Sequence, residues 1–420
     1  MVGGERIDGG PRSAIVVGAG IVGLSTAWFL QERGVEVTVV DRTGVAAGAS
    51  WGNAGWIAPG LALPLNSPGV LRHGLRALRD PRAPLHIPLA ADIGRRTFVS
   101  QFLAHCQRES WKRAMRANVA LNEDCIEAFD VLIANGVDAP VTDTPITALF
   151  RSTEDADHML WQLRQLEKAG QATDVTGLSG EALREQVPLA SPAITVGLNV
   201  NTQRFVDPRR FVEALGRAVA NRGATMHRLE IGNLASSVNG VTVYARSKVL
   251  TADAAVIATG AGLSQLAGRW LRVPVQAGHG YSFTVPVQHP IPSPIYLPGV
   301  RVACTPHHGG MRVSGTMEFR HPHRAVIPQR VEAIVAAASP LLSGVGWTER
   351  SNVWVGAHGI TPDGRALIGE VSPGIYVAGG HGMWGLAHGP VTGRLLAEQI
   401  TTGKQPEGLA DFDPLRRSGH

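Results

Sequence analysis

The sequence predicts an α/β protein in which a mostly parallel sheet, assembled from separated segments of the chain, is interleaved with an α+β domain built on an antiparallel sheet. A strand, a glycine turn, a helix and a second strand follow one another between Ser13 and Asp41. Residues 252–262 add an apolar strand that again ends on a glycine turn. Residues 273–320 instead have the pattern of antiparallel strands, with a hairpin turn at Gly309–Gly310.

The composition is that of a globular protein with enough mass for two or three domains. Of 420 residues, 44% are apolar and 17% are charged, and the net charge is +5. The arginines are scattered and not interleaved with aromatic residues, so we expect no binding to nucleic acid. The uncharged run at residues 14–30 is short for a membrane span and contains the glycine turn, so we interpret it as buried core. We expect a cytoplasmic protein, with peripheral contact at the inner face of the membrane as the alternative.

No pattern in the sequence points to a metal or a disulfide. The three cysteines, Cys106, Cys125 and Cys304, have no paired spacing, which favours a reducing compartment. His307 and His308 precede the hairpin turn and are expected to be exposed to solvent. No group of His, Asp or Glu residues has the spacing of metal ligands. We therefore predict no metal site.

The first strand–helix–strand unit has the features of a dinucleotide site. Gly18 permits the tight turn, Gly20 lets a pyrophosphate approach the backbone, and Gly23 lets the helix pack against the strand. The start of the helix offers unpaired N–H groups and a positive dipole end to phosphates. Asp41, at the end of the second strand, is placed to accept hydrogen bonds from the two ribose hydroxyls of an adenosine.

The rest of the chain supplies further helices and strands in turn. A loop of small residues after Asp41 contains Ser50 and Asn53, and residues 64–100 form an irregular segment of short helices and turns. Asp207 and Pro208 have the residue types that begin a helix. The remaining predicted helices lie at 100–135, 154–169, 179–188, 208–223, 329–338 and 381–400, and the remaining predicted strands lie at 146–151, 224–231, 241–245, 366–371 and 374–380.

These motifs together resemble the D-amino-acid oxidase/glycine oxidase superfamily of FAD enzymes, and within it the bacterial D-amino-acid dehydrogenase (small-subunit) branch. The resemblance rests on GAGIVG with Asp41, GASWGNAGWIAPG, NTQRFVDPRRFVEAL, VIATGA, GYSFTV, VRVACTPHHGGMRVSGTMEF, TPDGRALIG and GHGMWGLAHGPVTG. It implies a Rossmann-like FAD-binding domain of the glutathione-reductase type. It also implies FAD that is bound non-covalently, because Ser50 to Gly55 contains no His and the C-terminal glycine turn contains no Cys.

Nucleotide-type strands at the start, middle and end of the chain imply two interleaved domains. The FAD-binding domain would comprise residues 13–64, 201–265 and 355–408, and the substrate domain residues 65–200 and 266–354. Residues 1–12 are expected to be a disordered leader and residues 409–420 a tail. The cofactor-binding residues carried over by motif are Gly18, Ala19, Gly20, Ile21, Val22, Gly23, Asp41, Arg42, Ala49, Ser50, Asn53, Ala54, Gly55, Ile231, Thr259, Gly260, Gly380, Gly382, Met383, Trp384, Gly385 and Leu386.

One position departs from the family pattern. In the family, a Gly-Leu-Arg-Pro run supplies the arginine that binds the substrate carboxylate, whereas this chain has Gly356-Ala-His-Gly359, with His358 at the arginine position. Histidine offers one ring edge and is partly protonated near neutral pH, whereas arginine offers a charged fork. Three interpretations stay open: another cation binds the carboxylate, the substrate has no simple α-carboxylate, or the catalytic function has changed.

The candidate substrate-binding residues come from several separate segments of the chain. His358 is one of them and is also the catalytic candidate. Core packing is the alternative role for the aromatic and methionine members, and a structural role is the alternative for His358. The full set is Trp56, Tyr296, Arg301, Arg312, His358, Met383 and Trp384.

The predicted function is oxidation of the C–N bond of a small amine, in the first place a D-amino acid. Hydride transfer to flavin N5 would give an imine, which water hydrolyses to an oxo acid and ammonia, and no strong general base is required. The alternatives are a secondary amine of the opine, sarcosine or hydroxyproline type, and a flavoprotein subunit with altered or lost amine activity. The electron acceptor, whether oxygen, a quinone or a partner protein, is not indicated by the sequence.

Overall fold

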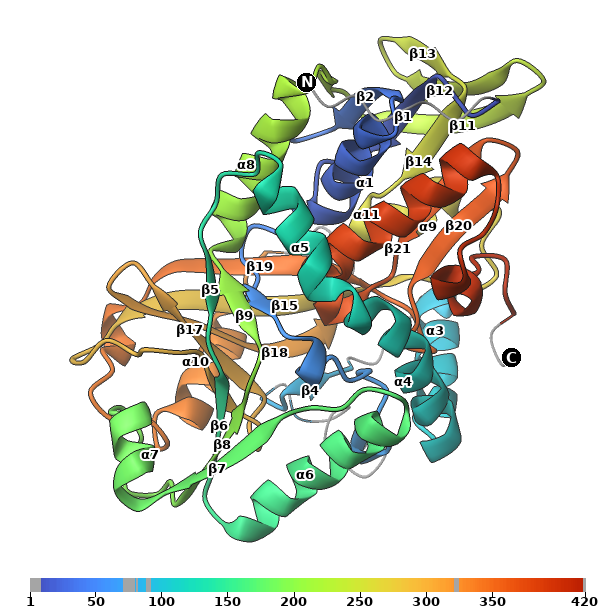
Figure 1. Cartoon of the computed structure of the whole chain (residues 1–420). Coiled ribbons are helices and arrows are strands. Elements are labelled where there is room, and N and C mark those ends of the chain that lie inside the picture. The colour runs from blue at the N-terminus through green and yellow to red at the C-terminus, as the bar shows by residue number, and fades with distance from the viewer. Residues whose placement is uncertain (1–8, 71–79, 81, 88–91, 321–324, 418–420) are drawn as a thin grey trace.

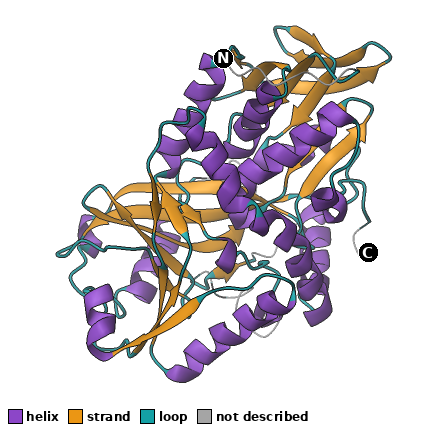
Figure 2. Cartoon of the chain, in the orientation of Figure 1, coloured by secondary structure: helices purple, strands orange, loops and turns teal. Residues whose placement is uncertain are grey.

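The structure is a computed structural model, and it describes residues 9–70, 80, 82–87, 92–320 and 325–417. Figure 1 shows one lobe around a parallel sheet at the upper right and a second lobe around a large antiparallel sheet at the lower left. In the described residues the first sheet has six strands and the second has nine. Helices lie on the outside of both sheets (Figure 2). The predicted fold class, an α/β domain interleaved with an antiparallel α+β domain, is confirmed.

The six-stranded sheet is assembled from the start, middle and end of the chain. Its strand order is β10–β2–β1–β14–β21–β20, and every neighbouring pair is parallel except β20–β21. The strands are β1 (Ser13–Val17), β2 (Glu36–Asp41), β10 (Thr225–Arg228), β14 (Ala254–Ile257), β20 (Leu367–Ser372) and β21 (Ile375–Gly379). The central strands are buried on both faces, as their continuous apolar sequences require.

Two layers cover this sheet. Helices α1 (Ile21–Glu32), α8 (Pro208–Asn221) and α11 (Gly385–Thr402) share one apolar core with it. The other face packs against a three-stranded antiparallel sheet and a short helix, which form a separate core. These elements are β11 (Ile231–Ser237), β12 (Gly240–Ala245), β13 (Val249–Ala252) and α9 (Leu263–Ala267).

Helices α1 and α11 pack in close contact through two glycines. A Cβ atom on Gly393 would lie 2.6 Å from the backbone nitrogen of Thr26, and a Cβ atom on Gly389 would lie 2.8 Å from a side-chain carbon of Ile21. Only glycine therefore lets the two backbones approach this closely. As a result, the N-terminus of α11 reaches the same edge of the sheet as the N-terminus of α1.

The nine-stranded sheet forms the second lobe. Its order is β19–β15–β18–β17–β16–β6–β8–β7, with β4 beside β18. The elements are β4 (Leu85–His86), β6 (Ile146–Phe150), β7 (Val175–Ser179), β8 (Val196–Val200), β15 (Gln276–Pro286), β16 (Ile295–Leu297), β17 (Val302–His307), β18 (Gly310–Phe319) and β19 (Ser351–Ile360), with helices α6 (Thr153–Lys168), α7 (Gly180–Gln186) and α10 (Pro328–Ala338). The boundary predicted at residue 355 falls inside β19, and the one predicted after residue 265 falls inside α9. The division into domains stays a prediction.

A helical segment and a small sheet link the two lobes. The region predicted as helical at 100–135 consists of α3 (Ile93–His105), α4 (Arg108–Glu123) and α5 (Cys125–Ala134). Helix α3 begins inside the segment predicted to be irregular, because Asp92 caps it by accepting a hydrogen bond from the Gly94 N–H at 3.0 Å. The small sheet is formed by β3 (Trp56–Ile57), β9 (Arg204–Val206) and β5 (Val141–Asp143). None of the described helices is both long and apolar enough to cross a membrane.

The structure differs from three expectations along the chain. The strand predicted at 224–231 is two strands, since the chain leaves β10 after Arg228 and enters the three-stranded sheet at Ile231. The predicted leader falls mostly outside the described residues, but the N–H of Arg12 donates to the Asp253 carboxylate at 2.6 Å. The predicted tail is packed against the first lobe, where Phe412 is fully buried.

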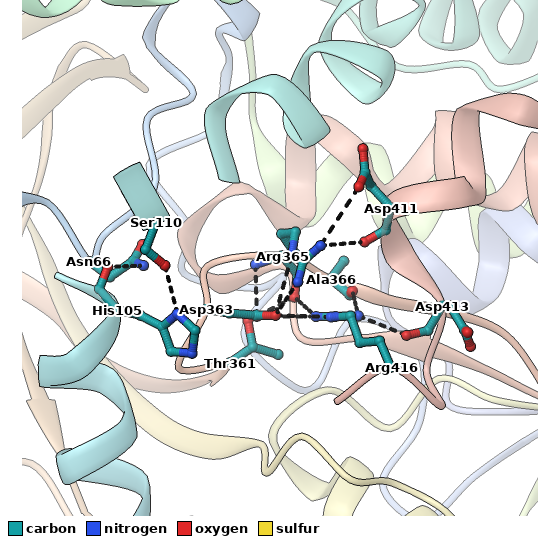
Figure 3. Close-up of polar contacts among 10 residues, drawn as sticks. All are labelled: Asn66, His105, Ser110, Thr361, Asp363, Arg365, Ala366, Asp411, Asp413 and Arg416. Carbon is teal, nitrogen blue, oxygen red and sulfur yellow. Dashed lines mark hydrogen bonds and ion pairs between the residues drawn. The ribbon is translucent and has the colours of Figure 1, made fainter. Parts of the chain in front are cut away.

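The C-terminal segment is fixed by a buried ion-pair network at the Thr361–Gly364 turn (Figure 3). The Asp363 carboxylate accepts hydrogen bonds from Arg416 Nε at 2.9 Å and from Arg365 Nη2 at 3.1 Å. Burial alone would raise the pKa of Asp363, but the two guanidinium groups outweigh burial and hold the pKa below its usual value. The ionised carboxylate therefore stabilises the fold.

The Asp363→Asn variant is expected to lose about 3 kcal/mol of unfolding free energy near neutral pH, because two buried guanidinium groups lose their counter-charge. The pKa of Asp363 is depressed in the folded state, so its contribution is complete above the ordinary carboxyl pKa of about 3.9 and is lost as pH falls through the depressed value. The difference from wild type in urea unfolding should thus shrink only in strong acid. Asp411→Asn is the control, since Asp411 is 59% exposed and pairs with Arg365 at 3.7 Å; a loss as large as that of Asp363→Asn would contradict the account.

Candidate active site

A cavity of about 530 Å³ lies at the carboxyl ends of β1, β2, β14 and β21. This is where ligands bind in open sheets of parallel strands. Of the residues predicted from the sequence to form the site, those that line the cavity are Gly18, Gly20, Ile21, Val22, Asp41, Arg42, Ala49, Ser50, Asn53, Ile231, Thr259, Gly260, His358, Gly380, Gly382, Gly385 and Leu386. Ala19, Gly23, Ala54 and Gly55 lie next to the cavity in the chain without lining it.

The glycine turn between β1 and α1 is shaped by close backbone contacts. A Cβ atom on Gly23 would lie 2.0 Å from the Gly18 carbonyl oxygen, and a Cβ atom on Gly18 would lie 2.4 Å from the Ala258 carbonyl oxygen. Gly18 also has a φ of +118°, which L-residues rarely adopt. These contacts hold the start of α1 against the ends of two strands.

The N-terminus of α1 is suited to an anionic group. Gly20 occupies the N-cap position without a side-chain hydrogen bond, and the first turn contains no acidic residue. The Ser50 hydroxyl accepts from the Ile21 N–H at 3.2 Å. The buried hydroxyl of Thr259, across the cavity, has no hydrogen-bond partner among the described residues. Helix N–H groups together with a buried hydroxyl fit the phosphate and ribose groups of a dinucleotide.

Asp41 holds the loop at the adenosine end of the predicted site. One carboxylate oxygen accepts from the Ala19 N–H at 2.9 Å, and the other accepts from the N–H groups of Thr43 at 2.8 Å and Gly44 at 2.9 Å. The carboxylate thus joins the end of β2 to the glycine turn. Its predicted contact with a ribose would add to these bonds and stays a prediction.

The opposite end of the cavity is formed by β19 and the turn before α11. Trp354, His358 and His381 line it, together with the glycines of that turn. The Trp354 indole lies between two glycines, since a Cβ atom on Gly52 would lie 2.1 Å from the ring and one on Gly356 only 1.8 Å from it. The side chain of the N-cap residue of α11, Trp384, does not cap the first turn of the helix, and this second helix start faces the same end of the cavity.

Both histidines at this end are uncharged. Burial, reinforced by the neighbouring His279, lowers the pKa of His358 to about 4, and burial lowers the pKa of His381 to about 4. The expectation that His358 is partly protonated near neutral pH is therefore wrong. Arg42, at the adenosine end, is the only cation among the described residues that line this cavity or the smaller one beside it.

The other predicted substrate residues do not line the main cavity. Met383 and Trp384 line a side cavity of about 30 Å³ that shares His381 and Gly382 with it. Trp56 and Tyr296 pack edge to face at 5.7 Å in an apolar cluster that Trp384 joins.

The two arginines suggested as replacement cations lie outside both cavities. The Arg312 guanidinium donates to Ser282 Oγ at 2.7 Å and to the Gly52 carbonyl at 3.3 Å, so it supports the Gly52 loop from behind. Arg301 lies in the turn before β17, and its charge acts on buried Tyr296, where it lowers a pKa that burial raises.

Sequence reasoning missed several residues that the fold places at the site. His381 lies in the quoted GHGMWG motif but was not singled out, and its ring contacts Thr392 Oγ1 at 3.0 Å. Trp354 lies just before the Gly356–Gly359 run and was not part of any quoted motif. Only the pairing of β19 with β15 places it at the cavity. The fold also brings Asp207 to His307 and His308, a grouping that spacing in the sequence does not reveal. The absence of a metal site stays a prediction.

The comparisons with known proteins agree with this geometry. The family model described as "DAO: FAD dependent oxidoreductase" matches residues 13–399. The chain belongs to this family. FAD is therefore its cofactor, and the protein is a flavoprotein oxidoreductase. The uncapped helix starts, the glycine turn and the Thr259 hydroxyl are the features expected to hold FAD in the cavity.

Solved structures share the whole fold at low sequence identity. Glycine oxidase from Bacillus cereus ATCC 14579 has 21% identity and a TM-score of 0.72, covering 97% of this chain and 99% of its own. L-proline dehydrogenase from P. horikoshii has 18% identity and a TM-score of 0.69, covering 98% of each chain. L-α-glycerophosphate oxidase from Mycoplasma pneumoniae, solved with FAD bound, has 18% identity and a TM-score of 0.71, covering 94% of this chain and 95% of its own. These likenesses show the fold; the substrates named for the three proteins differ.

The Gly23→Ala variant is expected to weaken FAD binding by about tenfold or more, because its methyl group would displace the backbone of the Gly18 turn at a cost of roughly 1–3 kcal/mol. Gly48→Ala is the matched control, since Gly48 lines the same cavity with no atom within 4 Å of its Cβ position. FAD titration of the flavin-free proteins measures the effect. Equal affinity in the Gly23→Ala variant and wild type would contradict the steric account of the turn.

His388 lines the side cavity, and the effect of its burial can be tested through the pH dependence of protein stability. Burial, reinforced by His381, lowers its pKa to about 3, and its ring donates to Asn122 Oδ1 at 2.7 Å. Between the unfolded pKa of about 6.5 and pH 3 the unfolded chain binds a proton that the folded chain excludes, so stability falls as pH falls. In His388→Gln the slope of unfolding free energy against pH should drop by up to about 1.4 kcal/mol per pH unit. Urea unfolding at pH 5 and pH 7 checks this, with exposed His158→Gln as the control; an unchanged slope in His388→Gln would refute it.

Proposed function

We propose that the protein oxidises the C–N bond of a small amine, with a D-amino acid as the first candidate substrate. The observation that carries the proposal is the uncharged ring end of the cavity, where two neutral imidazoles face the N-terminus of α11. A neutral amine is the form that gives up hydride, and neutral walls of this kind favour it over the ammonium ion. Membership of the DAO family supplies the oxidant.

The residues at this end have roles that follow from their chemistry. Neutral His358 and His381 can each donate one N–H and accept one hydrogen bond, which suits them to orient an amine or imine. With pKa values near 4 they are poor general bases near neutral pH, so positioning is the role we propose for them. FAD, when bound, accepts the two electrons of the C–N oxidation. The N-terminus of α11 stabilises negative charge that develops beside it.

A secondary amine, or an amine without a carboxylate next to the reacting carbon, is the second candidate. The observation that favours it is that no Lys or Arg is among the described residues lining the ring end or the side cavity. A carboxylate held there without a cation would lose a charge-assisted pair, which is worth about 1.5–3 kcal/mol. The exposed tip of Met383 and the amide of Asn66 line the side cavity and offer contacts to a substrate without a carboxylate.

An anaerobic substrate panel tests the proposed reaction. The flavin absorbance of the purified protein should bleach on mixing with at least one member of a panel of D-amino acids, N-alkylamino acids, cyclic amino acids and simple amines. Bleaching by D-amino acids supports the first candidate, and bleaching only by secondary or carboxylate-free amines supports the second. No bleaching by any amine would contradict both and leave a flavoprotein without amine activity.

The His358→Arg variant tests the carboxylate question at a single residue. An arginine at this position would place a cation at the ring end, so the KM for D-amino acids should fall by about tenfold or more relative to wild type. His358→Gln is the control, because it keeps a neutral polar group and adds no charge. Equal KM values in the two variants would remove His358 from the carboxylate site.

A further inference from the structure

Three side chains from distant parts of the sequence converge away from the flavin cavity. Oδ2 of Asp207 lies 3.2 Å from Nε2 of His308 and 3.8 Å from Nδ1 of His307. All three ligand atoms lie within 4.8 Å of one another, and the two imidazole rings are 4.2 Å apart between centroids. Asp207 follows β9 of the small linking sheet and begins α8 of the first lobe, whereas both histidines belong to the β17–β18 hairpin of the second lobe.

The position of Asp207 is fixed by the helix that it begins. Its Oδ1 accepts from the Arg210 N–H at 3.0 Å and so caps α8. Oδ2 is left to face the histidines. The preceding residue, Val206, donates its N–H to the Gly55 carbonyl at 2.8 Å, so the carboxylate is anchored to the loop that runs beside the cavity.

The β17–β18 hairpin, which carries both histidines, is also fixed by hydrogen bonds. Thr305, on the same face of β17 as His307, donates to the Ala54 carbonyl at 2.7 Å and accepts from the Trp56 indole at 2.8 Å. At the turn, His308 and Gly309 both have positive φ, +45° and +78°, a combination for which Asn-Gly is the preferred pair. Asparagine would adopt this strained backbone conformation more easily than histidine. The chain has histidine here, and its Nε2 points toward Asp207.

We propose that Asp207, His307 and His308 bind a divalent transition metal of the zinc class. Two imidazoles and one carboxylate are a ligand set that such ions prefer, whereas Mg²⁺ prefers oxygen ligands alone. Ligands of a tetrahedral ion with bonds of about 2.0–2.1 Å lie about 3.3 Å apart. The two distances from Asp207 to the histidines, 3.2 and 3.8 Å, are close to this value. His308 is 65% exposed, so the ion can enter from solvent and keep a water ligand. The bound metal would fasten the hairpin of the large sheet to the start of α8.

The test uses the FAD-loaded protein after treatment with a chelator. Calorimetric titration with Zn²⁺ should show one site per chain that Mg²⁺ does not fill. Asp207→Asn keeps a residue able to cap α8 but removes the charged ligand, and it should weaken Zn²⁺ binding by about tenfold or more. His289→Asn, at an exposed histidine that is not part of the Asp207–His307–His308 group, is the matched control and should bind as wild type does. Wild-type affinity in Asp207→Asn, or no Zn²⁺ binding by the wild type, would overturn the proposal in favour of a simple Asp–His contact.

The His308→Asn variant removes one proposed metal ligand and is expected to leave the fold intact. Asparagine suits the turn, so the metal-free variant should melt at or above the wild-type temperature. Zn²⁺ should raise the melting temperature of wild type by about 2 °C or more and leave that of His308→Asn unchanged. An equal Zn²⁺-dependent rise in both proteins would show that the ion binds elsewhere and would overturn the assignment.

Discussion

The steric fit between Gly23, Gly18 and Ala258 is the constraint on which the rest of the structure depends. Because no Cβ atom separates them, α1 starts directly against the ends of β1 and β14, and its N–H groups open into the cavity. Gly389 and Gly393 allow the same kind of close packing between α11 and α1. The two helix starts thus open into one cavity. A dinucleotide is the kind of ligand that can use both.

The sequence predicted features whose determinants are local. The first strand–turn–helix–strand unit was predictable because three glycines and an acid stand at fixed spacings, and the Asp207 cap of α8 was predictable from residue type. Features set by tertiary packing were not. The neutral state of His358 depends on burial by distant elements, the burial of Phe412 depends on the Asp363 network, and the approach of Asp207 to His307 depends on how the two lobes meet.

The electrostatics of the cavity divide it into two ends. Its charged walls, Asp41, Arg42 and Glu230, lie together around the start of the three-stranded sheet, whereas the ring end has neutral imidazoles, an indole and glycine backbone. Arg301 and Arg312, the cations predicted to replace the arginine that the resemblance led us to expect at position 358, line neither cavity and act elsewhere. Membership of the family supplies FAD as the oxidant, whereas solved structures that share the fold are named for glycine, proline and glycerophosphate, so the fold alone does not determine the substrate.

The central inference is that FAD lies in the cavity that the starts of α1 and α11 line. The most direct measurement is the flavin released from the purified protein by acid, identified by chromatography and counted against protein concentration. Release of FAD at about one molecule per chain, by acid alone, is the result expected for a non-covalent dinucleotide site. A colourless protein that takes up no FAD on incubation, or one that binds only a mononucleotide flavin, would contradict the assignment of the cavity and the chemistry built on it.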